Sequence, residues 1–439
     1  MLCKEGGPLM KILLDKENIV VQGMTHEEND WGKYQFPTPF FVDGKAVVSV
    51  FVDDDTLIND AKPCRWFETA DKGAHWNEVS PDIQEKCGLE LPNGDKLFFP
   101  TLPGTDLSDY TFTHPTMLTP DYDFSKPAEG KQLPIQDGIT AWFTGLVIRA
   151  YNADRLPYPL CEKKWTVERV TGNEKITEQA PLDWPYLTRV VMEHKGKNFM
   201  KSIQPIRKPK LAPDGSIWVS AFSGEGHINP KNGQYSPYYS AEILRSTDNG
   251  KTFHLHAHME YPADGEEYPY LSGGFSDNDF AFMDDGSIIW FFRSTWYGST
   301  GWEWAPMYHS RSVDGGKTWD KPKVFSPMGV FPSLCKLNCG VTLICYARPG
   351  LFVRACKNDD PTHWTDPIEV LPAENRSGLS NSKPAEPTWH QWDGQCGNPQ
   401  LIAVSDNEAL LLYGDFYYPD EHGIKRKTIL SRRITVISE

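Results

Sequence analysis

An acidic side chain and an imidazole two residues apart are the simplest candidates for proton-transfer chemistry in this sequence. Glu225 and His227 alternate with Gly224 and Gly226 on a loop that follows an apolar run ending at Phe222. A carboxylic acid and an imidazole in this arrangement can act as general acid and general base. Ordinary loop polarity explains the same residues equally well, so both interpretations stay open.

Two loops rich in aromatic residues could bind a sugar. Trp296, Trp302 and Trp304 crowd one of them, and residues 386–392, which include His390, form the other. Flat aromatic faces combined with a few polar groups are typical of small-molecule sites, and they suit the apolar faces of sugar rings. Packing of each loop on itself is the alternative. We predict that Trp296, Trp302 and His390 line a carbohydrate site.

Three alternating histidines could hold a metal ion. His254, His256 and His258 fall on one face of a strand, because side chains in a strand alternate between its two faces. We interpret them instead as surface histidines, since the strand follows a turn that we place at the outer edge of a sheet. The sequence also lacks a Gly-rich phosphate loop and a zinc-protease signature. It therefore predicts no metal and no cofactor.

A repeated octet supplies the elements that position these residues. Ser312–Trp319 reads Ser-Val-Asp-Gly-Gly-Lys-Thr-Trp, and residues 246–253 and 69–76 repeat its Ser/Thr, Asp, Gly and aromatic spacing. The Asp can accept hydrogen bonds from its own turn, Gly allows positive φ, and the aromatic residue anchors the returning strand. Each octet therefore predicts a tight turn between two strands.

Each octet closes a unit with the same order of predicted elements: strand, tight turn, strand, long loop, strand, octet, strand. The second strands of four units are apolar runs rich in β-branched and aromatic residues, at residues 216–222, 287–292, 341–346 and 408–413. A weaker unit within residues 96–170, where we expect Trp165 to close a turn, brings the total to six. Six four-stranded antiparallel units predict an all-β fold, a six-bladed β-propeller whose ring closure protects the sheet edges. A β-sandwich would leave the repeated octet unexplained.

Length, charge and hydropathy limit the class of protein. Repeated units can form one body, so we expect a single domain over residues 1–439, with a strand at about residues 10–23 completing the last unit. The net charge of −15 argues against nucleic acid or an anionic membrane as partner. The apolar run Met10–Leu14 is too short for a secretion signal, and no run approaches the ~18 residues of a membrane span. We expect a soluble, cytoplasmic protein, or a secreted one if a signal has been removed, and its oligomeric state stays open.

The octets resemble the Asp-box, or bacterial neuraminidase repeat, of the sialidase superfamily of six-bladed propellers. This resemblance covers nearly the whole chain at the level of the repeated units. It implies that Asp71, Asp248 and Asp314 are structural residues of outer turns. It also implies a site in the central depression at the opposite end of the sheets. There, sialidases hold a substrate carboxylate with three arginines, whose planar guanidinium groups suit that anion, and they use a Tyr nucleophile paired with Glu and an Asp acid/base.

The resemblance carries over to particular residues. The segment around Asp277 is similar to the family's segment in which an acidic residue begins a strand and an arginine ends the next. It implies that Asp277 takes the place of the Glu that assists the nucleophile, and that Arg293 is a substrate-binding arginine. Arg348 is similar to the next arginine of the triad. Asp60 lies where the acid/base Asp is expected, with residues 53–55 as competitors.

Two positions depart from the family pattern. Residues 37–39 read Pro-Thr-Pro where the family has Arg-Ile-Pro, so one arginine of the triad is missing. Asn398 stands where the family has its Tyr nucleophile. Arg207 could replace the missing arginine from another unit. These departures argue against a true sialidase.

The predicted function is an exo-acting glycoside hydrolase on a neutral or acidic terminal sugar, so the predicted partner is a carbohydrate substrate. Its candidate acid/base residues are Asp277, Asp60, Glu225 and His227. Its candidate substrate-binding residues are Arg207, Arg293, Arg348, Trp296, Trp302, His390 and Asn398. Two alternatives stay open. One is a polysaccharide lyase on a uronate-containing glycan, in which His227 or a tyrosine abstracts the proton, and the other is a non-catalytic glycan-binding propeller.

Overall fold

The chain consists of β-strands almost throughout the part that the structure describes. The computed structural model describes residues 10–25, 34–52, 64–100, 102–113, 128–141, 147–194, 196–223, 226–236, 238–261, 272–296, 306–347, 350–372 and 396–438. Within these ranges, helical structure is limited to the short 3-10 helices η2 (Pro81–Lys86) and η4 (Ala153–Arg155). None of the described helices is long and apolar enough to cross a membrane.

Three sheets contain a four-stranded antiparallel meander, in which each strand pairs with the one before it in the chain. The first consists of β3 (Gln35–Val42), β4 (Lys45–Phe51), β5 (Cys64–Thr69) and β6 (Asn77–Val79). The second consists of β24 (Ser272–Phe282), β25 (Ile288–Trp296), β26 (Met307–Ser312) and β27 (Lys323–Ser326). The third consists of β28 (Val330–Leu337), β29 (Val341–Ala347), β30 (Leu351–Lys357) and β31 (Asp360–Trp364), and β32 (Ile368–Leu371) also pairs with β30.

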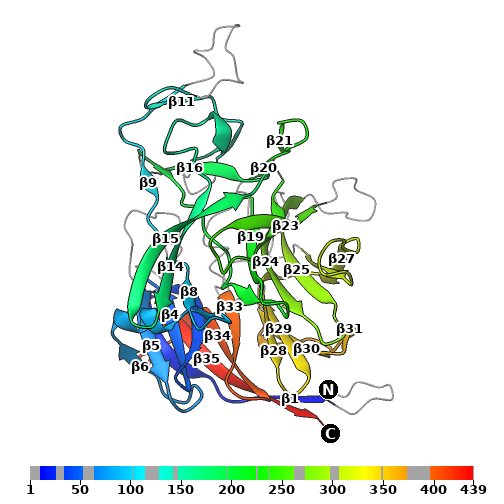
Figure 1. Ribbon diagram of the computed structural model, residues 1–439. Helices are drawn as coiled ribbons and strands as arrows, with labels where there is room; N and C mark the ends of the chain where they lie inside the picture. Colours follow the sequence, from blue (N-terminus) through cyan, green and yellow to red (C-terminus); the bar gives the residue numbers. More distant parts are fainter. Residues whose placement is uncertain are drawn as a thin grey trace.

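Both ends of the described chain contribute to one further sheet. It consists of β33 (Cys396–Ala403), β34 (Glu408–Pro419), β35 (Lys425–Ser438) and β1 (Met10–Leu14). Strand β2 (Asn18–Thr25) pairs with another part of β35. The strand expected near residues 10–23 is thus two strands, and both lie against the last strand of the chain. Figure 1 shows the two termini side by side.

An eight-stranded sheet joins another four-stranded meander to strands from earlier in the chain. The meander consists of β18 (Lys210–Leu211), β19 (Ile217–Phe222), β22 (Ser240–Ser246) and β23 (Phe253–Glu260). Strand β23 also pairs in parallel with β15, and the sheet continues through β15 (Glu174–Asp183), β14 (Lys164–Thr171), β8 (Lys96–Phe98) and β7 (Leu89–Glu90). Two expectations were therefore wrong. Strand β23 is not an edge strand, and Trp165 lies buried within β14 instead of closing a turn.

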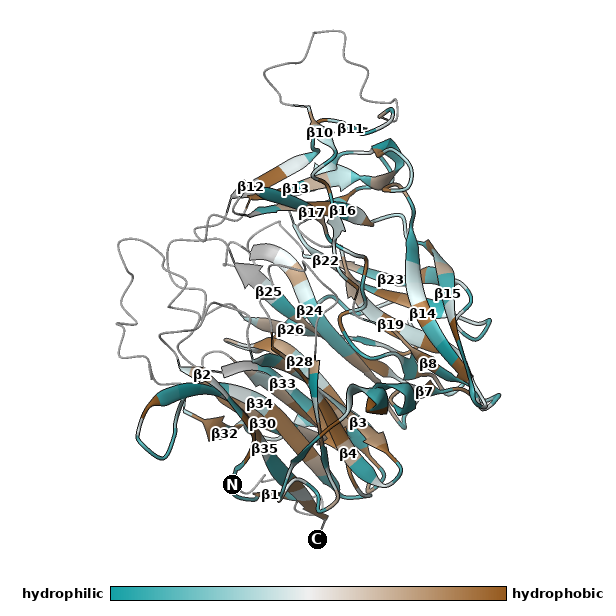
Figure 2. Ribbon diagram, turned by 90° about the vertical axis from the view of Figure 1, so that its left-hand side faces the viewer, coloured by the Kyte–Doolittle hydropathy of each residue, from teal (hydrophilic) through white to brown (hydrophobic). Residues whose placement is uncertain are grey.

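A separate sheet lies at the end of the molecule farthest from the termini (Figures 1 and 2). It consists of β12 (Gly138–Ala141), β13 (Val147–Asn152), β16 (Thr188–His194), β17 (Lys197–Met200) and β9 (Thr105–Asp106). Two short pairs complete the described strands, β10 (Thr111–Phe112) with β11 (Gln132–Leu133), and β20 (His227–Ile228) with β21 (Tyr235–Ser236).

Neighbouring sheets pack against one another through strands that consist mainly of apolar residues. The predicted second strands coincide, within one residue at their starts, with β19, β25, β29 and β34. All seven residues of β29 are buried, as expected for a strand covered on both faces. Strand β3 packs beside β33, β33 beside β28, β28 beside β24, and β24 beside β19. The leading strands β3, β33, β28 and β24 therefore lie next to one another, which brings the side chains at one end of these strands together.

The octets form tight turns with a shared set of hydrogen bonds. In the turn after β26, Asp314 Oδ1 accepts hydrogen bonds from the backbone N–H groups of Lys317 and Thr318 at 3.0 and 2.9 Å, and Asp314 Oδ2 accepts one from the Thr318 hydroxyl at 2.6 Å. The Ser312 hydroxyl accepts the Gly316 N–H at 2.9 Å. The equivalent bonds recur around Asp248. Within these turns the Asp side chains stabilise the backbone.

Candidate functional site

A bulge in β24 directs the Asp277 carboxylate toward the neighbouring strand. The register between β24 and β25 shifts between Phe275 and Asn278, so the residues between them stand out of the ladder. A bulge bends its strand and changes the direction of a side chain. Asp277 Oδ2 accepts a hydrogen bond from Arg293 Nη1 at 2.9 Å, and the two side chains are 14% and 19% exposed. Two candidates from the sequence thus lie together, with the Arg293 Nε–H buried and without a partner among the described residues.

Register shifts interrupt three other leading strands at corresponding places, in β3, β28 and β33. Each contains one residue with positive φ: Phe36 (+52°), Phe331 (+59°) and Asn398 (+56°). Such a conformation is uncommon for residues other than glycine and costs about 1–3 kcal/mol where the surrounding structure enforces it. In all three strands the next residue is proline, which has no N–H for the ladder and is confined to bulges and edges of sheets.

Arg207 extends from the segment before β18 to the bulge of β28. Its Nη2 donates a hydrogen bond to the Pro332 carbonyl oxygen at 2.6 Å, and its guanidinium lies over the Phe331 ring, 3.8 Å from the ring centre. The side chain is buried, and its Nε and Nη1 have no partner among the described residues. Burial lowers the pKa of Arg207 below the ordinary arginine value, and the charges of Asp279 and Asp277 oppose this effect. Unpaired N–H groups on a buried cation suit an anionic ligand.

Asn398 joins the bulges of β33 and β3. Its Nδ2 donates a hydrogen bond to Gln35 Oε1 at 3.1 Å, and both side chains are buried. The Gln35 Nε2 group has no partner within the described part of the chain. The Phe36 and Phe331 rings lie 5.9 Å apart, which links the bulges of β3 and β28. The side-chain amide of Asn398 thus binds another side-chain amide from a neighbouring sheet.

His227 lies on β20, in the connection between β19 and β22. This connection contacts β24 at its end. The end of this connection is fixed to β24, because the Phe275 N–H donates to the Tyr239 carbonyl oxygen at 2.9 Å. Gly274 permits the close approach, since a Cβ atom there would lie 2.2 Å from that oxygen. This backbone contact is two residues from Asp277.

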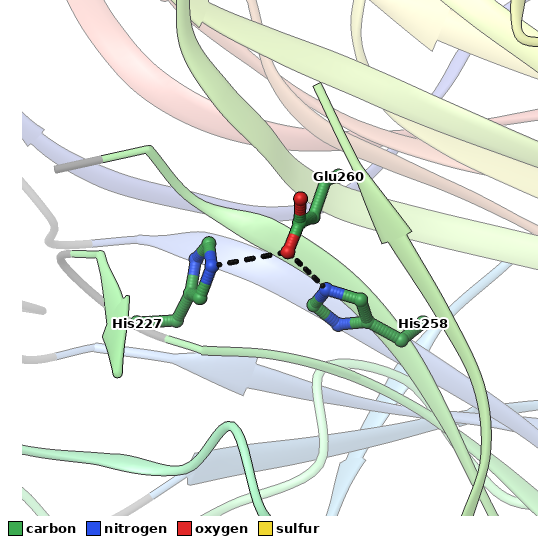
Figure 3. A group of neighbouring side chains, drawn as sticks. All are labelled: His227, His258 and Glu260. Atoms are coloured by element: carbon green, nitrogen blue, oxygen red, sulfur yellow. Dashed lines mark hydrogen bonds and ion pairs between the residues drawn. The ribbon is translucent and has the colours of Figure 1, made fainter. Parts of the chain in front are cut away.

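His227 has polar partners at both ring nitrogens. Its Nδ1 lies 2.9 Å from the Tyr238 carbonyl oxygen, and its Nε2 lies 3.4 Å from Glu260 Oε1. His258 Nε2 contacts the same carboxylate oxygen at 3.1 Å (Figure 3). The expectation that the three alternating histidines lie on the surface holds for His254, which is 62% exposed, and fails for His258, which is 13% exposed.

The acidic groups and histidines of this cluster shift one another's pKa values. Hydrogen bonds from His227 and His258 lower the pKa of Glu260. Burial acts to lower the pKa of His258, but hydrogen bonds to Glu242 and Glu260 outweigh it and raise that pKa. Burial raises the pKa of Glu242, which is fully buried, and its hydrogen bond with His258 opposes the rise. Two histidines and one carboxylate could hold a metal ion here, since one ligand atom of each lies within 4.8 Å of the others.

Several residues predicted for the site lie outside the described ranges. These are Asp60, Glu225, Arg348, Trp302 and His390. Trp296 ends β25, but its side chain is not among those described.

A pocket also occurs at the opposite end of the sheets. It is lined by residues of the β24–β25 and β28–β29 turns together with β1 and the β30–β31 turn, including Asp284, Gly340 and Asn358. This pocket lies away from the bulges, and we assign no chemistry to it.

Sequence reasoning missed Gln35, Glu242 and Glu260. The bulges did leave a signal, because Phe-Pro, Phe-Pro and Asn-Pro stand at the corresponding places of three leading strands. Glu242 leaves a weaker signal, as a charged residue in the otherwise apolar and small run Ser240–Leu244. A charge in such a run is expected to have a partner.

The chain is similar in structure to several solved proteins, at low sequence identity. They include a protein of unknown function from Dyadobacter fermentans (TM-score 0.48, 12% identity, covering 97% of this chain and 99% of that one). Another is the α-L-arabinanase of Penicillium chrysogenum in complex with arabinobiose (0.46, 10%, 97% and 98%). The NanB sialidase of Streptococcus pneumoniae is a third (0.45, 11%, 95% and 70%). No model of a protein family and no curated protein matches the sequence. These similarities concern the fold, and they assign no reaction to this chain.

Proposed function

We propose that this protein is a glycoside hydrolase that removes a terminal acidic sugar from a glycan. The observation that carries the proposal is the Arg207 guanidinium, which is buried and has two N–H groups without a partner among the described residues. Arg293 of β25, which is paired with Asp277, provides a second cation. Planar guanidinium groups bind a carboxylate through paired hydrogen bonds, and a charge-assisted bond inside a protein contributes about 1.5–3 kcal/mol.

In this proposal, Asp277 is the carboxylate that acts at the glycosidic bond. Its hydrogen bond to Arg293 fixes the orientation of the carboxylate and keeps the group close to the sugar anion. Hydrolysis of a glycoside commonly uses two carboxyl groups, one as acid and one as nucleophile or base. We propose Asp60 or Glu225 for the second role. Asn398 would contact the sugar, because it is an amide in the place of the family's tyrosine.

We further propose that the sheets are the blades of one six-bladed propeller. The adjacency of β3, β33, β28, β24 and β19 supports five blades around a common centre. For the sixth we propose β7, β8, β14 and β15. One side of this group packs on β19 and β22 through Trp165 and Leu244, and Cys87, which precedes β7, packs against Trp66 of β5. The sheet containing β12 and β13 would then be an addition to the ring.

A substrate screen tests the proposed reaction. The panel comprises aryl glycosides, uronate-capped oligosaccharides and a sialoside, and released reducing sugar is the readout. The proposal expects turnover of at least one substrate with an acidic terminal sugar, and slower turnover of its neutral counterpart. Turnover of neutral substrates alone, or of no substrate, would contradict it.

Two further readouts separate the alternatives. Ultraviolet absorbance from a new carbon–carbon double bond would identify a lyase, since hydrolysis creates none. Binding of acidic oligosaccharides without any turnover would identify a glycan-binding protein. In either case the hydrolase proposal fails, although Arg207 would keep its place in the binding site.

A further inference from the structure

His227 and His258 direct equivalent ring nitrogens toward one carboxylate oxygen. Both histidines use Nδ1 for a contact with the protein, at 2.9 Å to the Tyr238 carbonyl oxygen and at 3.1 Å to Glu242 Oε1. Both Nε2 atoms then face Glu260 Oε1, at 3.4 and 3.1 Å (Figure 3). The histidines come from β20 and β23, so the convergence is produced by the fold and not by adjacency in sequence.

The hydrogen-bond partners determine what lies at the point of convergence. A backbone carbonyl can only accept, so His227 Nδ1 must carry the proton. An ionised Glu242 imposes the same tautomer on His258. Two neutral imidazoles in this tautomer direct two nitrogen lone pairs at an anionic oxygen, which is unfavourable unless a cation lies between them. Either two additional protons or one metal ion supplies that positive charge.

The geometry points to a metal ion. We propose that His227 Nε2, His258 Nε2 and a Glu260 carboxylate oxygen bind one Zn²⁺. Tetrahedral zinc with bonds of about 2.0–2.1 Å places its ligand atoms roughly 3.3 Å apart. The two measured separations, 3.4 and 3.1 Å, lie on either side of that value. Two histidines and one glutamate leave one coordination position for water, as in catalytic zinc sites.

The surroundings have the features of a second coordination shell. A histidine that binds a metal usually donates its other N–H to a carboxylate or a backbone carbonyl, and both histidines do so here. Glu242 is fully buried and is itself held by the Ser240 hydroxyl. Tyr186 stacks on His258, with ring centres 3.5 Å apart, and fixes the ring plane. Glu260 is 51% exposed, which leaves solvent access for the metal and for the fourth ligand.

Metal titration tests the site in the full-length, tag-free protein after treatment with a chelator. Zn²⁺ binding is followed by calorimetry, and Co²⁺ is used as a spectroscopic probe because a tetrahedral site gives intense visible absorption. We expect one equivalent of Zn²⁺ to bind and to raise the melting temperature. Glu260→Gln and His258→Gln should each weaken Zn²⁺ binding by more than about 100-fold, since loss of an outer partner alone costs about 10–100-fold.

Matched variants distinguish this site from weak surface binding. His254→Gln removes an exposed histidine on the same strand, so it should leave both the affinity and the Co²⁺ spectrum unchanged. Glu242→Gln keeps all three ligands but changes the partner of His258, so a loss of about 10–100-fold is expected. Glu260 is half exposed, so Glu260→Gln should fold normally.

The proposal is overturned if wild-type protein binds no Zn²⁺. It is also overturned if Glu260→Gln binds Zn²⁺ as tightly as wild type. Both readouts are independent of any glycosidase substrate, so the zinc site and the proposed hydrolase activity can fail separately.

Discussion

The turns after the third strands and the bulges of the leading strands repeat in different ways. Around Asp248 and Asp314 the same side chains make the same hydrogen bonds, so both sequence and contacts recur. In the bulges only the register shift recurs, and the residues there include Asp277 in one strand, Asn398 in another and phenylalanine in two. A side chain that stabilises its own turn has little freedom to change. A bulge that is held by the backbone pairing of its strand leaves the side chain at that position free to differ.

This contrast separates residues that define the fold from residues that could define the reaction. Changes at the bulges should alter binding and turnover with little effect on stability. Changes at the octets should lower stability with little effect on binding and turnover. Four experiments test this division.

The largest effect is expected at the bulge of β24. Asp277→Asn keeps the size of the side chain but removes its charge and its role in proton transfer or attack. Turnover of the substrate found by the screen should fall by at least about 100-fold, the lower end of what a positioned acid or base contributes. The melting temperature should change little, because the group is partly exposed. Unchanged kcat would remove Asp277 from the site.

Arg207 should affect binding of the acidic sugar more than turnover. Arg207→Met retains much of the side-chain volume and contact with Phe331 but removes all N–H donors. Loss of a charge-assisted hydrogen bond, about 1.5–3 kcal/mol, corresponds to an increase of about 10–150-fold in KM. Steady-state kinetics with acidic and neutral substrates checks this. The neutral sugar is the control, and an equal loss for both would show that Arg207 has only a structural role.

The octet variants should change stability alone. Asp314→Ala removes the acceptor of four hydrogen bonds within the turn. At about 0.5–1.5 kcal/mol for each bond, and with part of the loss regained from water, we expect the free energy of unfolding to fall by about 1–3 kcal/mol. Denaturant unfolding measures this, and Asp248→Ala should give a similar value. A large loss of turnover at unchanged stability would contradict the division.

A histidine on the strand that leads to the third octet gives the smallest effect. Burial lowers the pKa of His309 to about 4, so the folded protein favours the neutral ring. Between about pH 6.5 and pH 4 the unfolded chain binds a proton that the folded protein does not, so stability falls on acidification through this range.

His309→Phe removes this titration and keeps a ring that can stack on Phe291. Between pH 7 and pH 5, wild type should lose up to about 2 kcal/mol more unfolding free energy than the variant. Unfolding curves at the two pH values measure the difference. Equal losses in the two proteins would show that His309 titrates normally.

Local patterns predicted much of the fold. The octets predicted the turns because all their hydrogen bonds form within eight residues, and apolar runs predicted β19, β25, β29 and β34. The prediction for the sheet containing β14 and β15 was wrong, because Trp165 was expected to close a turn and lies within β14. Its pairing joins β15 to β23 across about seventy residues, and nothing in the local sequence records that contact.

The candidate site was less predictable for the same reason. Asp277 and Arg293 are sixteen residues apart on adjacent strands, and the resemblance assigned both to the site without predicting their hydrogen bond. Gln35 and Asn398 are separated by 363 residues, so only the folded chain shows that their amides meet. The histidine cluster depends on three separate strands, β20, β22 and β23. The alternation of His254, His256 and His258 indicated a shared face but not which of them turns toward Glu260.

The pairing of β1 with β35 has a consequence for synthesis. Met10 lies opposite Ser438 and Leu14 opposite Ile434, so the earliest described strand can pair only after β35, more than 400 residues later, has been made. Every other meander can form from residues already made, but this sheet cannot. Contacts between distant parts of a chain are slow to form, and an unpaired strand is exposed to association with other chains. The nascent chain therefore carries β1 without its partner until β35 has been made, and chaperone demand should be greatest in that interval.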